Sequence, residues 1–414
     1  MYLEKRVWIM IIEFSIANFL SFKDKVTFSM LADTKEELAD NYIVKDNKKI
    51  LKTAAIYGAN ASGKTNIMKV VGTVVNILRE CNNYNIDTEL PIEPFKFSKD
   101  TKNQPSEFEI KFIADDTRYV YGFSATKKKV LEEYLYYYPN NREAIIFDRT
   151  NTNEYEFNIE DKKIINDIKN KTNENKFFLA TSATWNFTKV KTPYTFLSSI
   201  LVSSNSNNFN NSLFKLLKDY EKEIKPFTLN MLKDADLNIE DYKIVEIPMP
   251  EEVLKNLKFD KYYEILFKHK GTDEYLSSNE ESLGTINFFA LIPLMYFASK
   301  SEMVIFLDEI DKSLHSYLVE HLIAMFNDKE QNINNSQLIF NTHDTNLLDL
   351  NILRRDQIWF TEKNANTGES TLYPLSDFSV RKQENIEKGY LLGRYGAVPF
   401  IKNDFNLVKH EEDK

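Results

Sequence analysis

The segment 58–65 reads Gly-Ala-Asn-Ala-Ser-Gly-Lys-Thr and matches the phosphate-loop pattern G-x-x-x-x-G-K-[ST] in full. An apolar stretch (54–57) precedes it and a helix-compatible run (66–78) follows it, which is the strand, turn and helix context that the motif needs. The loop and helix N–H groups can then surround a phosphate chain, with Lys64 reaching the β- and γ-phosphates. The expected nucleotide-binding residues are Gly58, Asn60, Ala61, Ser62, Gly63, Lys64, Thr65 and Asn66.

An apolar run that ends in two carboxylates lies far downstream of this loop. Residues 303–309 read Met-Val-Ile-Phe-Leu-Asp-Glu, which predicts a central parallel strand buried on both faces. Ligands bind at the carboxyl ends of strands in open α/β sheets, where Asp308 and Glu309 would lie. We therefore expect Thr65 and Asp308 to bind Mg²⁺, and Glu309 to polarise an attacking water.

Two further segments complete the pattern. Residues 337–344 predict another short apolar strand, and His343 at its end could donate a hydrogen bond to a γ-phosphate. Ser282 and Gly284 stand directly before the apolar stretch 286–298, where a hydroxyl and unobstructed N–H groups at a helix start can bind an anion. The expected catalytic residues are therefore Lys64, Glu309 and His343, with Ser282 and Gly284 as further nucleotide contacts.

These motifs together resemble the ABC-type ATPase superfamily, in its soluble branch of SMC-like, RecF-like and OLD-like ATPases. Besides the phosphate loop and His343, the similar segments are an N-terminal strand and turn (16–22), a signature motif (281–285) and an acidic strand with its D-loop (308–315). The signature reads Glu-Ser-Leu-Gly-Thr and lacks the Gln of transporters.

Two other positions also differ from transporter ATPases. Ile310 and His315 replace the Pro and Asp that transporter ATPases usually carry there, which argues against a membrane transporter module. The D-loop form of 308–315 and the closing segment 389–399 are most similar to bacterial ATPases of abortive-infection and anti-phage systems. The AbiL and RloA group is the nearest comparison, and the PARIS ATPase AriA is a relative of it.

The resemblance implies an α/β fold: an ABC-type P-loop ATPase head with a mixed sheet, an antiparallel β subdomain and a helical insertion. Alternating residues within 107–138 independently predict an antiparallel meander. The expected units are an N-terminal lobe (1–150), a helical insertion (151–240) and a C-terminal lobe (241–414). Within them we expect helices at 164–168 and 213–220, a mobile Ser- and Asn-rich loop at 203–211, and strands at 244–247 and 262–268 that return the chain to the second lobe.

The resemblance also implies ATP and Mg²⁺ as cofactors and a homodimer, or a higher even-numbered oligomer, in which two chains enclose two ATP molecules head to tail. The chain carries no recognisable nuclease or toxin centre of its own. The effector would therefore be a separate protein encoded nearby and similar to RloB, and DNA or a phage protein would be the trigger. Two alternatives stay open: a RecF- or SMC-like DNA-repair ATPase that acts directly on DNA, and a scaffold that uses ATP mainly for assembly.

Composition supports a cytoplasmic protein without a membrane span. The formal net charge of −9 disfavours a globally basic nucleic-acid binder. The single cysteine, Cys81, excludes an intramolecular disulfide framework and fits a reducing compartment. Glu13 interrupts the first apolar run too early for a signal peptide, and Met10 could be the natural start. The stretch 286–298 is too short to span a bilayer and predicts a buried helix.

Two segments late in the chain carry weaker signals of structure or function. Arg354-Arg355 predicts a surface turn before a strand at 357–361. The closing Arg394-Tyr395-Gly396 could either dock a partner or complete the fold. The lysines of the insertion are expected to be a solvated surface rather than a nucleic-acid site.

Overall fold

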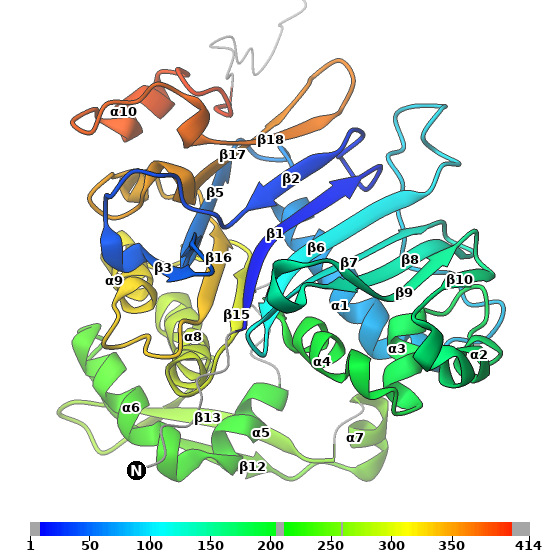
Figure 1. Cartoon of the computed structure of the whole chain (residues 1–414). Helices are drawn as coiled ribbons and strands as arrows, with labels where there is room; N and C mark the ends of the chain where they lie inside the picture. The colour runs from blue at the N-terminus through cyan, green and yellow to red at the C-terminus, as the bar shows by residue number, and fades with distance from the viewer. Residues whose placement is uncertain (1–8, 204–210, 258–259, 400–414) are drawn as a thin grey trace, which may run out of the picture.

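The apolar runs of the sequence pair as neighbours in one core sheet of the computed structural model, which describes residues 9–203, 211–257 and 260–399 (Figure 1). The strand order is β11-β15-β16-β5-β17-β18, in which the first five strands are parallel and β18 is antiparallel to β17. All residues of β5, β15 and β16 are buried, as expected for parallel strands covered on both faces. The core strands are β5 Thr53–Gly58, β11 Leu201–Ser203, β15 Val304–Leu307, β16 Gln337–Asn341, β17 Ile358–Lys363 and β18 Ser370–Pro374.

The predicted antiparallel meander is confirmed and belongs to a seven-stranded sheet of order β10-β9-β8-β7-β6-β1-β2. Its inner face buries alternate aromatic and aliphatic residues, such as Phe108, Phe112 and Phe123, and its outer face carries polar residues. A separate hairpin joins β3 Tyr42–Lys45 to β4 Lys48–Leu51. The strands of the sheet are β1 Met10–Ala17, β2 Val26–Ser29, β6 Ser106–Ala114, β7 Thr117–Ala125, β8 Val130–Tyr137, β9 Ala144–Thr150 and β10 Glu154–Glu156.

Helix α1 (Lys64–Glu80) connects these two sheets through one hydrophobic core. Apolar residues spaced three or four apart, including Ile67, Val71 and Val74, are buried, while Lys69 on the opposite side is exposed. Three short helices of the predicted insertion pack into the same core: α2 Lys162–Lys169, α3 Phe178–Thr184 and α4 Lys191–Ser199. The helix that follows the phosphate loop therefore lies at the centre of the N-terminal part.

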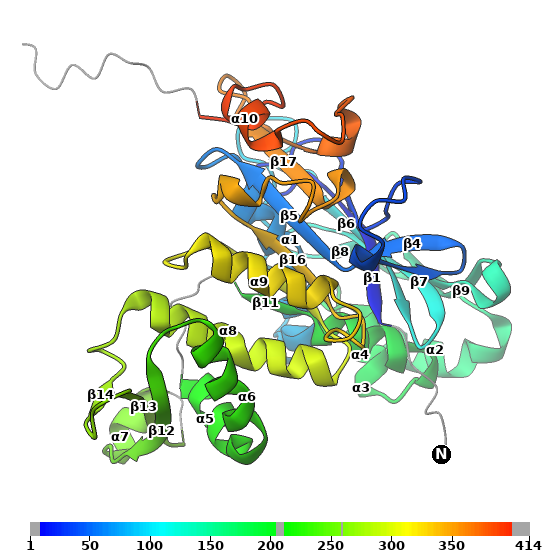
Figure 2. The same cartoon turned by 90° about the vertical axis from the view of Figure 1, so that its left-hand side faces the viewer.

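A second group of elements lies on the opposite side of α8 from the core sheet (Figure 2). It comprises α5 Asn211–Asp219, α6 Glu221–Asp234, α7 Glu251–Leu257 and a sheet of β12 Ile239–Ile247, β13 Tyr262–His269 and β14 Tyr275–Ser277. The strands expected to return to the second lobe thus pair with each other. The helices of 151–240 divide between two hydrophobic cores, and most of the expected loop 203–211 lies outside the described residues.

Helix α8 (Leu283–Lys300) covers the predicted apolar stretch, and α9 (Ser316–Asn327) packs near it against the core sheet. Among the described residues, α8 alone has the length and apolar composition that a membrane crossing needs. Its Phe289 packs edge-on against Tyr242 and Phe267, with ring centroids 5.1 Å apart in both pairs. This packing is typical of the core helix of a globular domain.

The closing segment completes the fold on the face of the core sheet opposite α1. Tyr390 of α10 (Ile386–Leu391) stacks on Phe360 at 5.5 Å and contacts Tyr57 at 6.0 Å between ring centroids. Tyr395 stacks on the same Phe360, at 6.0 Å. In addition, Thr345 Oγ1 donates a 2.7 Å hydrogen bond to Glu387 Oε1, which ties α10 to the loop after β16.

The prediction of a surface turn at Arg354-Arg355 was wrong. Arg354 is 2% exposed and Arg355 is 5% exposed. Arg354 forms ion pairs with Asp33 at 3.0 Å and with Asp356 at 2.8 Å, and these carboxylates allow its charge to be buried. The arginines therefore join the start of β17 to the N-terminal part of the chain.

Candidate functional site

The phosphate loop connects the end of β5 to the start of α1. Gly63 has φ 124°, a backbone conformation that side chains other than glycine rarely adopt. Gly58 has no room for a side chain, since a Cβ there would lie 2.4 Å from the carbonyl oxygen of Thr361. The hydroxyls of Ser62 and Thr361 are 2.6 Å apart, and Ser370 Oγ donates to Ser62 O at 2.6 Å. Side chains of β17 and β18 thus hold the loop in shape.

Lys64 is folded over this loop and is 6% exposed. Its Nζ donates to the carbonyl oxygens of Gly58 at 2.8 Å and Ala59 at 3.1 Å. Burial lowers the pKa of Lys64 to about 8, although the charges of Asp308 and Glu309 oppose this shift. An anion in the loop would stabilise the protonated amine, so binding of a phosphate and protonation of Lys64 are coupled.

The carboxyl ends of β5, β16 and β15 meet at this loop because these strands are parallel neighbours. Thr65 Oγ1 donates to Asp308 Oδ1 at 3.1 Å, so the last turn of the loop and the acidic strand are joined directly. Hydroxyl and carboxylate oxygens are ligands that Mg²⁺ prefers, and Mg²⁺ in such sites also binds substrate phosphates and water. Within the described residues, no cluster of three or more His, Cys, Asp or Glu could hold a metal ion.

Asn341 is a site residue that the sequence analysis missed. It is fully buried at the end of β16, its Nδ2 donates to Asp308 Oδ1, and its Oδ1 accepts a 2.6 Å hydrogen bond from Glu309 N. One amide therefore orients both acidic residues. The sequence signal was a polar residue at the last position of an otherwise apolar strand, directly before Thr342 and His343.

Glu309 and His343 lie beside this network at the edge of the sheet. Glu309 begins the turn after β15 with φ 54° and is partly exposed. His343 N donates to both carboxylate oxygens of Asp311 at 3.3 Å, and its side chain is exposed. Although the side chain is exposed to solvent, partial desolvation of the ring and the charge of Lys64 lower the pKa of His343, which favours the neutral imidazole. A neutral imidazole can donate one hydrogen bond and accept another.

Ser282 and Gly284 lie at the start of α8, next to the D-loop. Ser282 caps the helix by accepting a 3.1 Å hydrogen bond from Thr285 N. A Cβ at Gly284 would lie 2.8 Å from Ser313 O, so only glycine allows this close approach. Among the hydrogen bonds of the described residues, none joins Ser282 or Gly284 to the loop 58–65. A hydrogen bond and charge interactions thus link the loop to Asp308, Glu309 and His343, whereas no such interaction of the described residues reaches Ser282 or Gly284.

The edge strand β11 is a second feature that the sequence analysis missed. It is parallel to β15, and Asp308 N donates to Ser203 O at 3.0 Å. The end of β11 therefore lies beside Asp308. Only three residues form β11, so its apolar pattern could not be distinguished from that of a helix end.

The parallel part of the core sheet carries the phosphate loop at its carboxyl edge, and the acidic strand β15 is the second neighbour of β5. Together with the antiparallel β subdomain, this arrangement defines a P-loop ATPase head of the predicted fold class. The chain belongs to the family described as "AAA domain, putative AbiEii toxin, Type IV TA system", whose profile matches residues 54–349. This range contains the phosphate loop, the signature segment, the acidic strand and His343.

Solved structures with partial similarity are SMC head domains. An SMC head bound to the C-terminal winged-helix domain of ScpA matches with a TM-score of 0.44 and 15% identity over 88% of this chain and 97% of that chain. The SMC head domain from Thermotoga maritima matches with a TM-score of 0.40 and 14% identity over 88% of this chain and 98% of that chain. An SMC head domain from Pyrococcus furiosus has an extended coiled coil and is bound to the C-terminal domain of ScpA. It matches with a TM-score of 0.41 and 16% identity over 94% of this chain and 99% of that chain. No curated protein sequence matches the chain.

Proposed function

We propose that this chain is the ATP-binding and ATP-hydrolysing subunit of a bacterial anti-phage defence system. The observation that carries the catalytic part is the hydrogen bond from Thr65 to Asp308, since it joins the phosphate loop to the acidic strand. The defence role rests on the family description, which names a toxin of a type IV toxin–antitoxin system, and on the similarity of segments 308–315 and 389–399 to abortive-infection ATPases.

Each side chain has a distinct role in this proposal. The N–H groups of residues 58–66 and the amine of Lys64 bind the phosphates of ATP, and Thr65 and Asp308 bind Mg²⁺. The ion would neutralise charge on the phosphates. Glu309 accepts a hydrogen bond from the attacking water, and His343 donates one to the γ-phosphate. The Asn341 amide holds the Asp308 carboxylate and the Glu309 backbone N–H in position.

We further propose that Ser282 and Gly284 act on the nucleotide of a second copy. Neither residue forms a hydrogen bond with residues 58–65 within the described part of its own chain, and the neighbouring Leu283 and Tyr317 are 68% and 75% exposed. Two copies placed head to tail with C₂ symmetry would bury these side chains and complete both sites. The dimer would control a separate effector protein in the cytoplasm, similar to RloB, in response to DNA or a phage protein.

A Ser282→Arg variant tests the dimer. We expect it to bind ATP with unchanged affinity, because the hydrogen bonds of Ser282 among the described residues go to Thr285 and not to its own phosphate loop. It should stay monomeric and lose at least about tenfold in turnover, because a second copy would meet a large cation. The measurements are light scattering with ATP and steady-state phosphate release.

The matched control is Thr195→Arg, which adds the same charge on an exposed position of α4. Equal turnover and dimerisation of Ser282→Arg and wild type would overturn the head-to-tail arrangement. Turnover by the wild-type monomer that rises only on addition of DNA would instead favour a repair ATPase.

Asn341→Leu tests the positioning of the acidic pair. Loss of the two hydrogen bonds to Asp308 and Glu309 is expected to lower kcat by roughly 10–100-fold, as for other residues that orient metal-binding side chains. ATP affinity should change much less, because the phosphate loop is intact. Titration with a fluorescent ATP analogue and a melting curve separate this effect from unfolding, and an unchanged kcat would contradict the role.

A further inference from the structure

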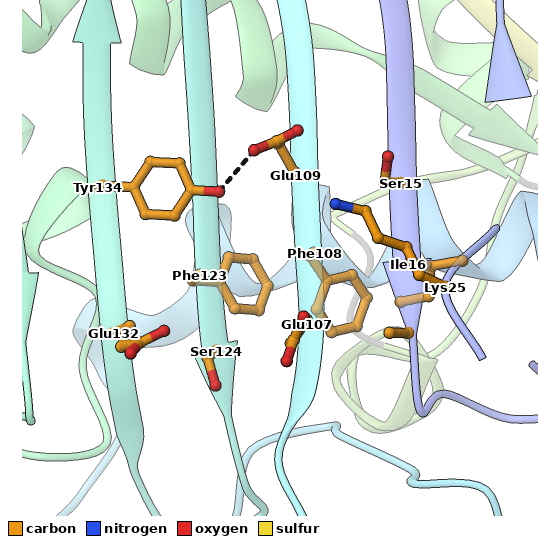
Figure 3. A pocket seen from close by; sticks show the side chains of 11 residues that line it. Ser15, Ile16, Lys25, Glu107, Phe108, Glu109, Phe123, Ser124, Glu132 and Tyr134 are labelled. Atoms are coloured by element: carbon orange, nitrogen blue, oxygen red, sulfur yellow. Dashed lines mark hydrogen bonds between the residues drawn. The ribbon is translucent and has the colours of Figure 1, made fainter. Parts of the chain in front are cut away.

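The outer face of the seven-stranded sheet contains a polar hollow that is separate from the nucleotide site (Figure 3). Its volume is about 60 Å³, and residues of β1, β6, β7 and β8 line it. The hollow arises because small side chains alternate with long ones across neighbouring strands. Pairing places Ala17, Glu107, Ser124 and Glu132 in one row, and Ser15, Glu109, Gly122 and Tyr134 in the next.

Two carboxylates at the hollow have no partner. Among the described residues, Glu107 and Glu132 form no ion pair and no side-chain hydrogen bond, whereas Glu109 accepts a 2.7 Å hydrogen bond from Tyr134 and lies 3.7 Å from the Lys111 amine. Lys25 is the single basic residue of the lining. The hollow therefore has a net negative charge and attracts a cation.

Ser124 points to a ligand independently of the charges. It is 6% exposed, lines the hollow between Glu107 and Glu132, and its hydroxyl has no hydrogen-bond partner among the described residues. Although most of the residue is buried, its oxygen opens to the hollow, so it can donate and accept hydrogen bonds with a ligand that displaces water there. A group with several N–H donors, placed between the two glutamates, could bond to all three side chains.

Tyr134 supplies an aromatic surface at the same place. Its ring lies flat over Gly122, where a Cβ would be 2.3 Å from the ring, and it stacks on Tyr136 with centroids 5.0 Å apart. Figure 3 shows the ring seen face-on from outside the sheet, with its hydroxyl directed to Glu109. A cation above this ring would interact with its negative face.

We propose that the hollow binds an arginine side chain of a partner protein. A guanidinium is planar, carries five N–H donors and stacks on aromatic rings, which fits two carboxylates, a hydroxyl and a flat tyrosine better than a compact ammonium does. Glu107 and Glu132 stand two strands apart, about 10 Å between their backbones, a span suited to a polyatomic cation. A single side chain fills the hollow, so the remaining affinity comes from the partner's contacts with the surrounding sheet face.

This inference goes beyond the proposed ATPase function, since no residue of the hollow belongs to the nucleotide site. The test uses a fluorescein-labelled peptide with alternating arginine and glycine, titrated with the full chain and read by anisotropy. Glu107→Gln/Glu132→Gln should weaken binding by about tenfold or more, because two charge-assisted hydrogen bonds are lost. The matched control, Glu154→Gln/Glu156→Gln, removes the same charge from exposed positions of β10 and should change affinity less than about twofold.

Three further ligands, namely the citrulline peptide, the lysine peptide and spermine, make the outcome decisive. Replacement of arginine by neutral citrulline should abolish binding, and replacement by lysine should weaken it. A melting curve checks that each variant is folded. Equal losses in both double variants, equal binding of the citrulline peptide, or tighter binding of spermine than of the arginine peptide would each overturn the proposal, the last in favour of a free polyamine.

Discussion

Glu309→Gln is expected to lower ATP turnover by roughly 100-fold or more while ATP stays bound and the dimer stays closed. Glutamine has nearly the same shape as glutamate but cannot accept the proton of the attacking water. The fold around it should not change, because the hydrogen bond that fixes this turn runs from Glu309 N to Asn341 and does not use the side chain. Single-turnover hydrolysis of radiolabelled ATP, combined with light scattering, measures both effects.

Lys64→Ala gives the contrasting result that makes this experiment specific. Loss of the buried amine should abolish detectable ATP binding, and therefore dimerisation as well, whereas Glu309→Gln should favour the dimer. Glu330→Gln, at an exposed position beyond α9, is the charge-matched control and should behave like wild type. Undiminished turnover in Glu309→Gln would show that another group activates the water.

Arg149→Leu is expected to lower the free energy of unfolding by about 3–5 kcal/mol. Arg149 is not one of the residues of the nucleotide site. Arg149 and Glu133 are both fully buried, with Nη1 and Oε2 3.7 Å apart. Glu133 also accepts hydrogen bonds from Phe178 N and Leu179 N at the start of α3, and Arg149 donates to the carbonyl oxygens of Thr152 and Lys176. Removal of the cation leaves a buried carboxylate without its charge partner.

The loss should depend on pH. Burial raises the pKa of Glu133 even in the presence of Arg149, and loss of the arginine raises it further. A carboxyl with a raised pKa in the folded state binds more protons there than in the unfolded state. Stability therefore falls as pH rises from the ordinary carboxyl pKa through the raised one. Relative to wild type, Arg149→Leu should therefore lose more free energy of unfolding at pH 8 than at pH 5.5.

Chemical denaturation at both pH values measures this difference. Arg142→Leu, which removes a charge from an exposed turn of the same sheet, is the control and should change stability by less than about 0.5 kcal/mol. A loss below about 1 kcal/mol in Arg149→Leu at pH 8 would mean that water or a local rearrangement compensates the buried carboxylate.

The parts of the fold that the sequence predicted correctly are those with a strong local pattern. Residues 54–57 and 303–307 are continuous apolar runs, and 107–138 alternates, so the strand type could be assigned without knowledge of the partners. The expected roles of all the site residues, from the phosphate loop to Asp308, Glu309, His343, Ser282 and Gly284, remain predictions, because they depend on a ligand or a second copy. The packing of the insertion on two different cores had no local signal.

The errors share one cause, which is pairing between residues far apart in the chain. Arg354 is buried because Asp33, 321 positions away, supplies a charge partner, and nothing near Arg354 in the sequence indicates that carboxylate. Asn341 gains its role only when β16 lies beside β15. In both cases a polar residue becomes a buried partner through tertiary contacts that the local sequence does not indicate.

The hydrogen bond between Thr345 and Glu387 has a mechanical consequence for the loop that carries His343. Because Tyr57 OH also donates to Asp344 O at 3.2 Å, the loop is attached to β5 on one side and to α10 on the other. A displacement of the backbone of this loop would strain the bond to Tyr57, and it would either break the bond to Glu387 or carry α10 with it. The stiffness of the histidine loop is thus set by residues near the end of the chain, some forty positions downstream.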